Sequence, residues 1–144
     1  MKRIDDTRRF DIPIERAFAF ITDPGNWPKF WPGFVALVPG SRWGAVGDTT
    51  RLVSRLLGRD RELTMTLTTF DTNRLVAYRS VQDGLPDVHH ERAFTPDGDG
   101  FIYGLAAVYT PRPGLAGLFD RIALPRAIRR AFTATFDALE REMR

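Results

Sequence analysis

The chain has 144 residues, of which 43% are hydrophobic and 27% charged, and its formal net charge at pH 7 is +3. This length suffices for one domain with a buried core, so we expect a single domain over residues 1–144. The absence of cysteine excludes disulfide bonds, thiolate nucleophiles and cysteine-ligated metals. The N-terminal segment is charged and lacks the apolar run of a signal peptide, which favours the cytoplasm.

The distribution of charge and hydrophobicity narrows the range of partners. Nearly all of the positive charge is arginine, and it is interleaved with aspartate and glutamate along the chain. This spreading is typical of a solvated surface, so we predict no nucleic-acid binding. No stretch approaches the roughly 20 apolar residues of a membrane-spanning helix, which predicts no stable membrane insertion.

The N-terminal part of the chain predicts one strand followed by two short helices. Residues 2–12 alternate between apolar and charged side chains, as in a strand. Pro13 suits the first turn of a helix, and apolar spacing over 14–21 predicts that helix. Pro24, which follows an aspartate suited to N-capping, starts a second short helix that we expect to end near Trp31.

Six further strands are predicted in the middle of the chain. Their ranges are 35–38, 49–57, 61–70, 75–81, 87–95 and 101–110. The third of them is the clearest, because Leu63, Met65 and Leu67 alternate with threonines. Short connections, among them a hairpin turn at 97–100, imply antiparallel neighbours.

The remaining chain predicts a long amphipathic helix. Apolar residues recur every three or four positions from Leu115 to Met143. Pro125 lies within this stripe, and an interior proline costs about 3 kcal/mol. We therefore expect a break or kink there, with the main helix beginning at Arg126. The arginines beside the stripe suit either an anionic membrane or solvent, and the need for the stripe in the core favours solvent.

Several strings of residues carry a resemblance to a known family. They are Ile-Pro-Ile-Glu-Arg-Ala-Phe-Ala-Phe-Ile-Thr-Asp-Pro (12–24), Trp-Pro-Lys-Phe-Trp-Pro-Gly (27–33), Val-Gly-Asp-Thr-Thr-Arg-Leu (46–52) and Phe-Thr-Pro-Asp-Gly-Asp-Gly (94–100). Together they resemble the polyketide cyclase/dehydrase branch of the START-like (SRPBCC) superfamily, over essentially the whole chain.

The resemblance implies an α+β helix-grip fold. In that fold a seven-stranded, curved antiparallel sheet wraps around a long C-terminal helix, and two short helices lie between strands 1 and 2. A cavity remains between the sheet and the helix. Members of the superfamily bind lipids, sterols, polyketides or other apolar molecules there, and some are aromatase/cyclases.

Aromatic residues gather where the resemblance places the entrance of the cavity. They form either a rim that gates the ligand or a plug that fills the open end of the sheet as ordinary core. These residues are Trp27, Phe30, Trp31, Phe34 and Trp43.

The strand at 87–95 carries the most informative polar residues. Alternation places His90 and Arg92 on the same face as Val88 and Phe94, toward the cavity. An inward Arg92 would indicate an acidic group on the ligand, whereas a bulge or the sheet rim would leave it in water. His90 is either an acid–base group or a satisfied interior side chain. His89 points to the opposite face, so we predict no metal site and no cofactor.

The predicted ligand-binding set combines side chains from all these elements. Tyr78 and Tyr103 each add one hydroxyl that suits the orientation of a mostly apolar ligand. The set comprises Trp27, Trp31, Phe34, Arg55, Leu63, Met65, Leu67, Tyr78, His90, Arg92, Phe94, Tyr103, Phe132 and Phe136. No nucleophile elbow or phosphate-binding loop is present, and no catalytic residue is identified.

Three functions are compatible with these features. The first is a carrier or sensor of a small, largely apolar molecule that is lipid-, polyketide- or aromatic-like, in a monomer or homodimer. The second is a cyclase/dehydratase-type enzyme, which requires Tyr78, His90, Arg92 or Tyr103 to converge in the cavity. The third is a protein–protein module with a filled cavity and an exposed apolar patch. The shortage of catalytic groups favours the first.

Overall fold

The computed structural model describes residues 1–144. Its elements, in chain order, are β1 (Lys2–Phe10), α1 (Ile14–Thr22), the 3-10 turn η1 (Pro24–Asn26), α2 (Trp27–Phe30), β2 (Phe34–Leu37), β3 (Thr49–Leu56), β4 (Arg59–Asp71), β5 (Leu75–Val81), β6 (Val88–Asp97), β7 (Gly100–Tyr109) and α3 (Gly114–Glu142). Every predicted strand is present within three residues of its expected ends. The two short helices follow β1 as predicted.

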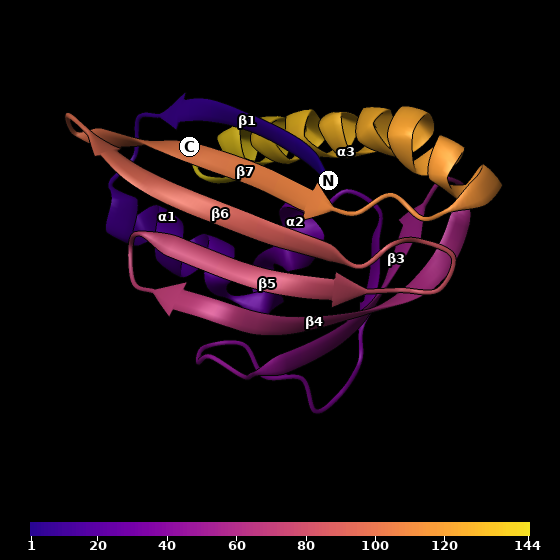
Figure 1. The fold of residues 1–144 in the computed structure, drawn as a ribbon. Coiled ribbons are helices and arrows are strands. Elements are labelled where there is room, and N and C mark those ends of the chain that lie inside the picture. Colours follow the sequence, from indigo (N-terminus) through magenta and orange to yellow (C-terminus); the bar gives the residue numbers. More distant parts are fainter.

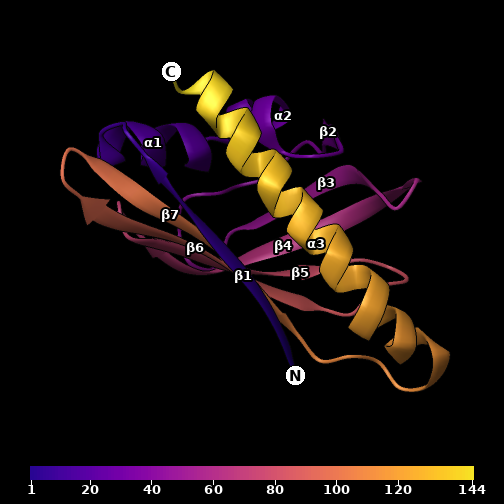
Figure 2. The same ribbon diagram turned by 90° about the horizontal axis from the view of Figure 1, so that it is seen from above.

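The seven strands form one antiparallel sheet in the order β1-β7-β6-β5-β4-β3-β2. Figure 1 shows this sheet as a curved layer with the three α-helices on one side of it. Figure 2 shows α3 running obliquely over that side, with its first turns projecting beyond the sheet. The predicted α+β helix-grip layout is therefore confirmed.

Alternation along the strands determines which side chains face the helices. On β4, Leu63, Met65 and Leu67 are buried, whereas the threonines between them are more exposed. The pairing of β4 with β5 shifts by one residue between Leu67 and Thr69. Such a shift bends a strand and increases its twist, which helps the sheet to curve around α3.

Helix α3 is continuous through Pro125, so the predicted break at this proline and the start at Arg126 were wrong. The helix spans 29 residues, and both Leu124 and Pro125 are buried. An interior proline loses one backbone hydrogen bond. Burial of the surrounding apolar side chains offsets this cost, because tertiary packing overrides local helix propensity. No helix in the structure combines the length and the apolar character needed to cross a membrane.

The start of α3 is held by an ion pair with the segment that follows β7. Asp120 is fully buried and accepts hydrogen bonds from Arg112, at 2.8 Å from Nη2 and 3.0 Å from Nε. It also accepts a hydrogen bond from the Arg112 backbone N–H at 2.8 Å. Hydrogen bonding to the Arg112 side chain lowers the pKa of Asp120. Gly117 permits this close turn, because a Cβ there would lie 2.0 Å from the Arg112 carbonyl oxygen.

Replacing Asp120 should therefore destabilise the fold strongly. Asp120→Ala is expected to lower the free energy of unfolding by about 2–4 kcal/mol, since it breaks a buried, multiply hydrogen-bonded pair. Urea denaturation at pH 7 measures the loss. Asp137→Ala is the matched control, because Asp137 pairs with Arg8 at the surface, where such pairs contribute about 0–1 kcal/mol. Equal losses in the two variants would contradict the role assigned to Asp120.

Candidate ligand-binding site

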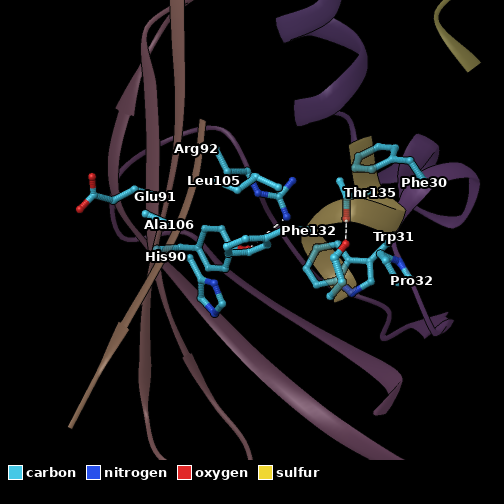
Figure 3. A pocket seen from close by; sticks show the side chains of 12 residues that line it. Phe30, Trp31, Pro32, His90, Glu91, Arg92, Leu105, Ala106, Phe132 and Thr135 are labelled. Atoms are coloured by element: carbon cyan, nitrogen blue, oxygen red, sulfur yellow. Dashed lines mark hydrogen bonds between the residues drawn. The ribbon is translucent and has the colours of Figure 1, made fainter. Parts of the chain in front are cut away.

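A pocket of about 110 Å³ lies between α3, the end of α2 and the central strands β5, β6 and β7 (Figure 3). Seven of its 12 lining residues are hydrophobic, so the pocket offers mainly apolar contact. The lining residues are Phe30, Trp31, Pro32, Tyr78, His90, Glu91, Arg92, Leu105, Ala106, Ala131, Phe132 and Thr135. The Glu91 side chain points away from the pocket in Figure 3.

A second hollow of about 10 Å³ lies next to this pocket. Trp31, Tyr78 and Arg92 line both hollows and separate them. Trp27 and Trp43 line the second one, so all three tryptophans of the chain surround this region. The rings pack closely, with Trp27 and Trp43 centroids 5.4 Å apart and Trp43 and Tyr78 centroids 5.3 Å apart.

The small volume of these two hollows indicates that aromatic side chains fill most of the space between the sheet and α3. Typical ligand pockets measure roughly 300–1,000 Å³. Trp27 is fully buried, and its Nε1 donates to the Ile21 carbonyl oxygen at 3.0 Å, so this ring is core. Trp31 is only half-buried, and it lines the pocket directly after the last residue of α2.

The regular alternation of β6 brings Arg92 to the pocket. Arg92 pairs in register with Val76 on β5 and Leu105 on β7, without a bulge. The expected inward direction of His90 and Arg92 is therefore observed, and the alternative of a bulge that turns Arg92 into water is not.

The Arg92 guanidinium is held by aromatic groups and not by a carboxylate. Its Nη2 donates to the Tyr78 hydroxyl at 3.1 Å. Its Cζ lies 5.2 Å from the centroid of the Trp31 ring and 5.5 Å from that of Tyr78, within the range of cation–π attraction. Burial lowers the pKa of Arg92, but Tyr78 and Tyr103 raise it by more, so the group stays charged.

The Tyr103 hydroxyl is buried and has no hydrogen-bond partner. Tyr103 lies on β7 opposite Phe94, which places it diagonally next to Arg92 on β6. Burial raises the pKa of Tyr103 to about 12, although Arg92 opposes this rise. An unpaired buried hydroxyl costs about 1–3 kcal/mol, and this one lies beside the Arg92 guanidinium and lines neither hollow.

His90 is a neutral, hydrogen-bonded side chain. Its ring stacks on Tyr78 with centroids 4.7 Å apart, and its Nε2 lies 2.9 Å from the Ser80 hydroxyl. Burial, followed by the nearby charge of Arg92, lowers the pKa of His90 to about 3. Ser80 is buried and does not line the pocket. The Ser80–His90 pair therefore fixes the ring and does not form an accessible nucleophile with its base.

The predicted site residues fall into three groups. Those that line one or both hollows are Trp27, Trp31, Tyr78, His90, Arg92, Phe94 and Phe132. Those that belong to the core without lining a hollow are Phe34, Leu63, Met65, Leu67, Tyr103 and Phe136. The third group is Arg55 alone.

Arg55 lies outside the site, so its inclusion among the cavity residues was wrong. On β3, Thr50, Leu52 and Ser54 are buried, and alternation turns Arg55 to the opposite face. There it opposes Asp60 of β4, and its Nε donates to Asp60 Oδ1 at 2.8 Å.

Sequence reasoning missed several lining residues, of which Thr135 is the most informative. Thr135 lies three positions after Phe132, so it occupies the same face of α3. Its hydroxyl donates to the Ala131 carbonyl oxygen at 2.8 Å. The helical period around Phe132 was the available signal.

Wider hollows at the surface are less suitable for an apolar molecule. The largest, of about 870 Å³, is open to solvent beside the β4–β5 turn and is lined mainly by polar residues. No group of three or more His, Cys, Asp or Glu side chains is arranged to hold a metal ion.

The lowered pKa of His90 predicts that the folded protein loses stability in mild acid. The unfolded chain protonates this residue near pH 6.5, whereas the folded protein does so only near pH 3. The unfolded state therefore binds more protons between these values, and the folded state loses stability as the pH falls through that window. Protonation linked to His90 is expected to lower the free energy of unfolding by about 2 kcal/mol between pH 7 and pH 5.

Urea denaturation at pH 7 and pH 5 measures this effect. The free energy of unfolding of His90→Gln should fall by about 2 kcal/mol less than that of the wild type over this interval. The control His89→Gln changes the partly exposed histidine on the opposite face of β6 and should behave as the wild type. The same pH dependence in all three proteins would contradict the partly buried, neutral state of His90.

Comparisons with known proteins agree with this architecture. A sequence model of the family described as polyketide cyclase / dehydrase and lipid transport matches residues 1–144. A search of the curated proteins finds no match. Among solved structures, the chain is similar to the Zhui aromatase/cyclase from Streptomyces sp. R1128, with a TM-score of 0.82 and 17% identity over 98% of this chain and 92% of that one.

Two further structures show the same likeness. TTHA0849 from Thermus thermophilus has a TM-score of 0.78 and 16% identity, with 97% of this chain and 95% of that one covered. CV1439 from Chromobacterium violaceum has a TM-score of 0.76 and 19% identity, with 97% and 96% covered. At these identities the likeness shows a shared fold. Because the family model spans the entire sequence, the chain belongs to the polyketide cyclase/dehydrase and lipid transport family.

Proposed function

We propose that the protein binds a small, largely apolar molecule in the pocket between α3 and the central strands, as a carrier or sensor. The observation that carries this proposal is the pocket itself, which combines an apolar lining with a few convergent polar groups. That combination is typical of small-molecule sites. The family description, which includes lipid transport, supports the same class of ligand.

The pocket volume limits what can bind without movement. A dry apolar cavity of about 150 Å³ accommodates benzene, and this pocket is about 110 Å³. A larger ligand therefore requires a side chain to move. Trp31 is the best candidate, because it is half-buried, separates the two hollows and directly follows the four-residue helix α2.

Mass spectrometry tests the carrier function directly. The protein is recovered from its native host under several growth conditions and measured under native conditions. A copurified apolar compound of defined mass is expected, and it should be released on denaturation. An empty protein in every condition, together with no uptake of the neutral fluorescent probe N-phenyl-1-naphthylamine, would contradict the proposal.

Trimming Trp31 should widen the pocket. Trp31→Ala merges the two hollows, so the Kd for N-phenyl-1-naphthylamine is expected to fall at least about tenfold, since additional apolar surface is buried. Fluorescence titration measures the affinity. Phe34→Ala is the control, because Phe34 is a half-buried aromatic residue that lines neither hollow. Unchanged affinity in Trp31→Ala, or an equal gain in Phe34→Ala, would show that Trp31 does not limit the site.

One observation favours a cyclase/dehydratase-type enzyme as the second candidate. Tyr78, His90 and Arg92 converge on the pocket from two adjacent strands, with Tyr103 beside them on the next. However, the pKa values of His90 and Tyr103, about 3 and about 12, lie far from the neutral range that suits proton transfer. The small pocket also leaves little room to fold a long reactive chain, which places the carrier first.

The protein–protein alternative agrees with the structure only in part. Leu115, Leu118 and Ile122 are exposed on the first turns of α3, as an apolar docking patch would require. The same alternative predicts a filled interior, and the pocket between α3 and the sheet is not filled.

A further inference from the structure

We propose that the ligand carries a carboxylate, which pairs with Arg92 inside the pocket. This inference rests on the proposed function and names the ligand class: a compact aromatic or aliphatic acid whose apolar part lies against Trp31 and Phe132. Neither the fold nor the family description specifies an acidic ligand.

The Arg92 side chain has no acidic partner within the protein. Every ion pair of the protein within 4.0 Å joins other residues, and Arg92 takes part in none. Glu91, its neighbour along β6, points to the other face and lies 3.8 Å from both Arg3 and His89. Arg92 is partly buried, and a guanidinium that loses much of its water contact needs an anion or enough hydrogen bonds to compensate it.

Most N–H donors of the Arg92 guanidinium make no hydrogen bond within the protein. A guanidinium has five N–H donors, and Arg92 uses one of them, toward the Tyr78 hydroxyl. The rings of Trp31 and Tyr78 stack near the guanidinium, which orients it without using its remaining donors. A planar fork held in this way matches the two oxygens of a carboxylate.

The groups around Arg92 favour a ligand with one acidic group and an apolar body. His90 lines the same pocket but is hydrogen-bonded to Ser80 and neutral, so it does not compete with Arg92 for the anion. The buried Tyr103 hydroxyl lies next to Arg92 and lines neither hollow, so it influences the ligand only through the guanidinium. The apolar remainder of the lining favours a hydrocarbon body over a hydrated inorganic anion.

Benzoate and benzamide form the test pair, since they have nearly the same shape and differ in charge at pH 7. Isothermal titration calorimetry gives both affinities, and tryptophan fluorescence reports binding at the site. Wild type should bind benzoate at least about tenfold more tightly than benzamide, as expected for a hydrogen bond to a charged group. Arg92→Met should remove this preference, so that benzoate and benzamide bind with affinities within about threefold of each other.

Two more variants keep the test decisive. Arg92→Lys retains the charge but not the fork, so an intermediate preference is expected, and it replaces Arg92→Met if circular dichroism shows that the latter is unfolded. Tyr103→Phe removes a hydroxyl beside Arg92, so it should weaken benzoate binding about twofold to tenfold and reduce the preference for benzoate over benzamide.

The outcomes separate this inference from the proposed function. If wild type binds benzamide and N-phenyl-1-naphthylamine but shows no preference for benzoate, the acidic ligand is refuted and the apolar pocket stands. A benzoate preference that persists in Arg92→Met would place the anion elsewhere and also refute the inference. If wild type binds none of the three compounds and also copurifies with no apolar compound, the proposed function itself fails.

Discussion

The positive charge of the Arg92 guanidinium on the inner face of the sheet is the constraint on which the site depends. A charged group on the inner face of the sheet needs compensation, and here Trp31 and Tyr78 provide part of it, as ring faces and one hydroxyl. These contacts explain why a basic side chain is tolerated on the inner face of the sheet. The Arg92 charge also contributes to the neutral state of His90, because it adds to the effect of burial in lowering the pKa of His90.

The fold produces this arrangement through simple strand geometry. Tyr78, Arg92 and Tyr103 come from the consecutive neighbours β5, β6 and β7, and each points inward by alternation. Helix α3 covers them with Phe132 and Thr135. The buried Arg112–Asp120 pair fixes the start of that helix, and the half-buried ring of Trp31 lines the pocket from the end of α2.

Local pattern was enough to predict most of the fold and the core of the site. The alternation of 61–70 and 87–95 correctly gave the inward faces of β4 and β6, because regular pairing preserves a period of two. The same rule, applied to the strand of Arg55, would have excluded that residue, since Thr50, Leu52 and Ser54 take the inner positions.

Features that depend on distant contacts could not be predicted from local pattern. Pro125 stays within a continuous helix because packing outweighs its local cost. The pocket volume depends on how Trp27, Trp31 and Trp43 pack together across α2 and the β2–β3 connection, which no single segment specifies. The missing hydrogen bond of Tyr103 likewise follows from the assembled sheet.

A crystal structure of the protein grown with benzoate tests the central claim most directly. The account predicts the benzoate ring between Phe132 and a displaced Trp31 ring, with its carboxylate oxygens about 3 Å from the Arg92 guanidinium nitrogens. An unchanged pocket with no benzoate in it, or benzoate bound only at the protein surface, would contradict the claim.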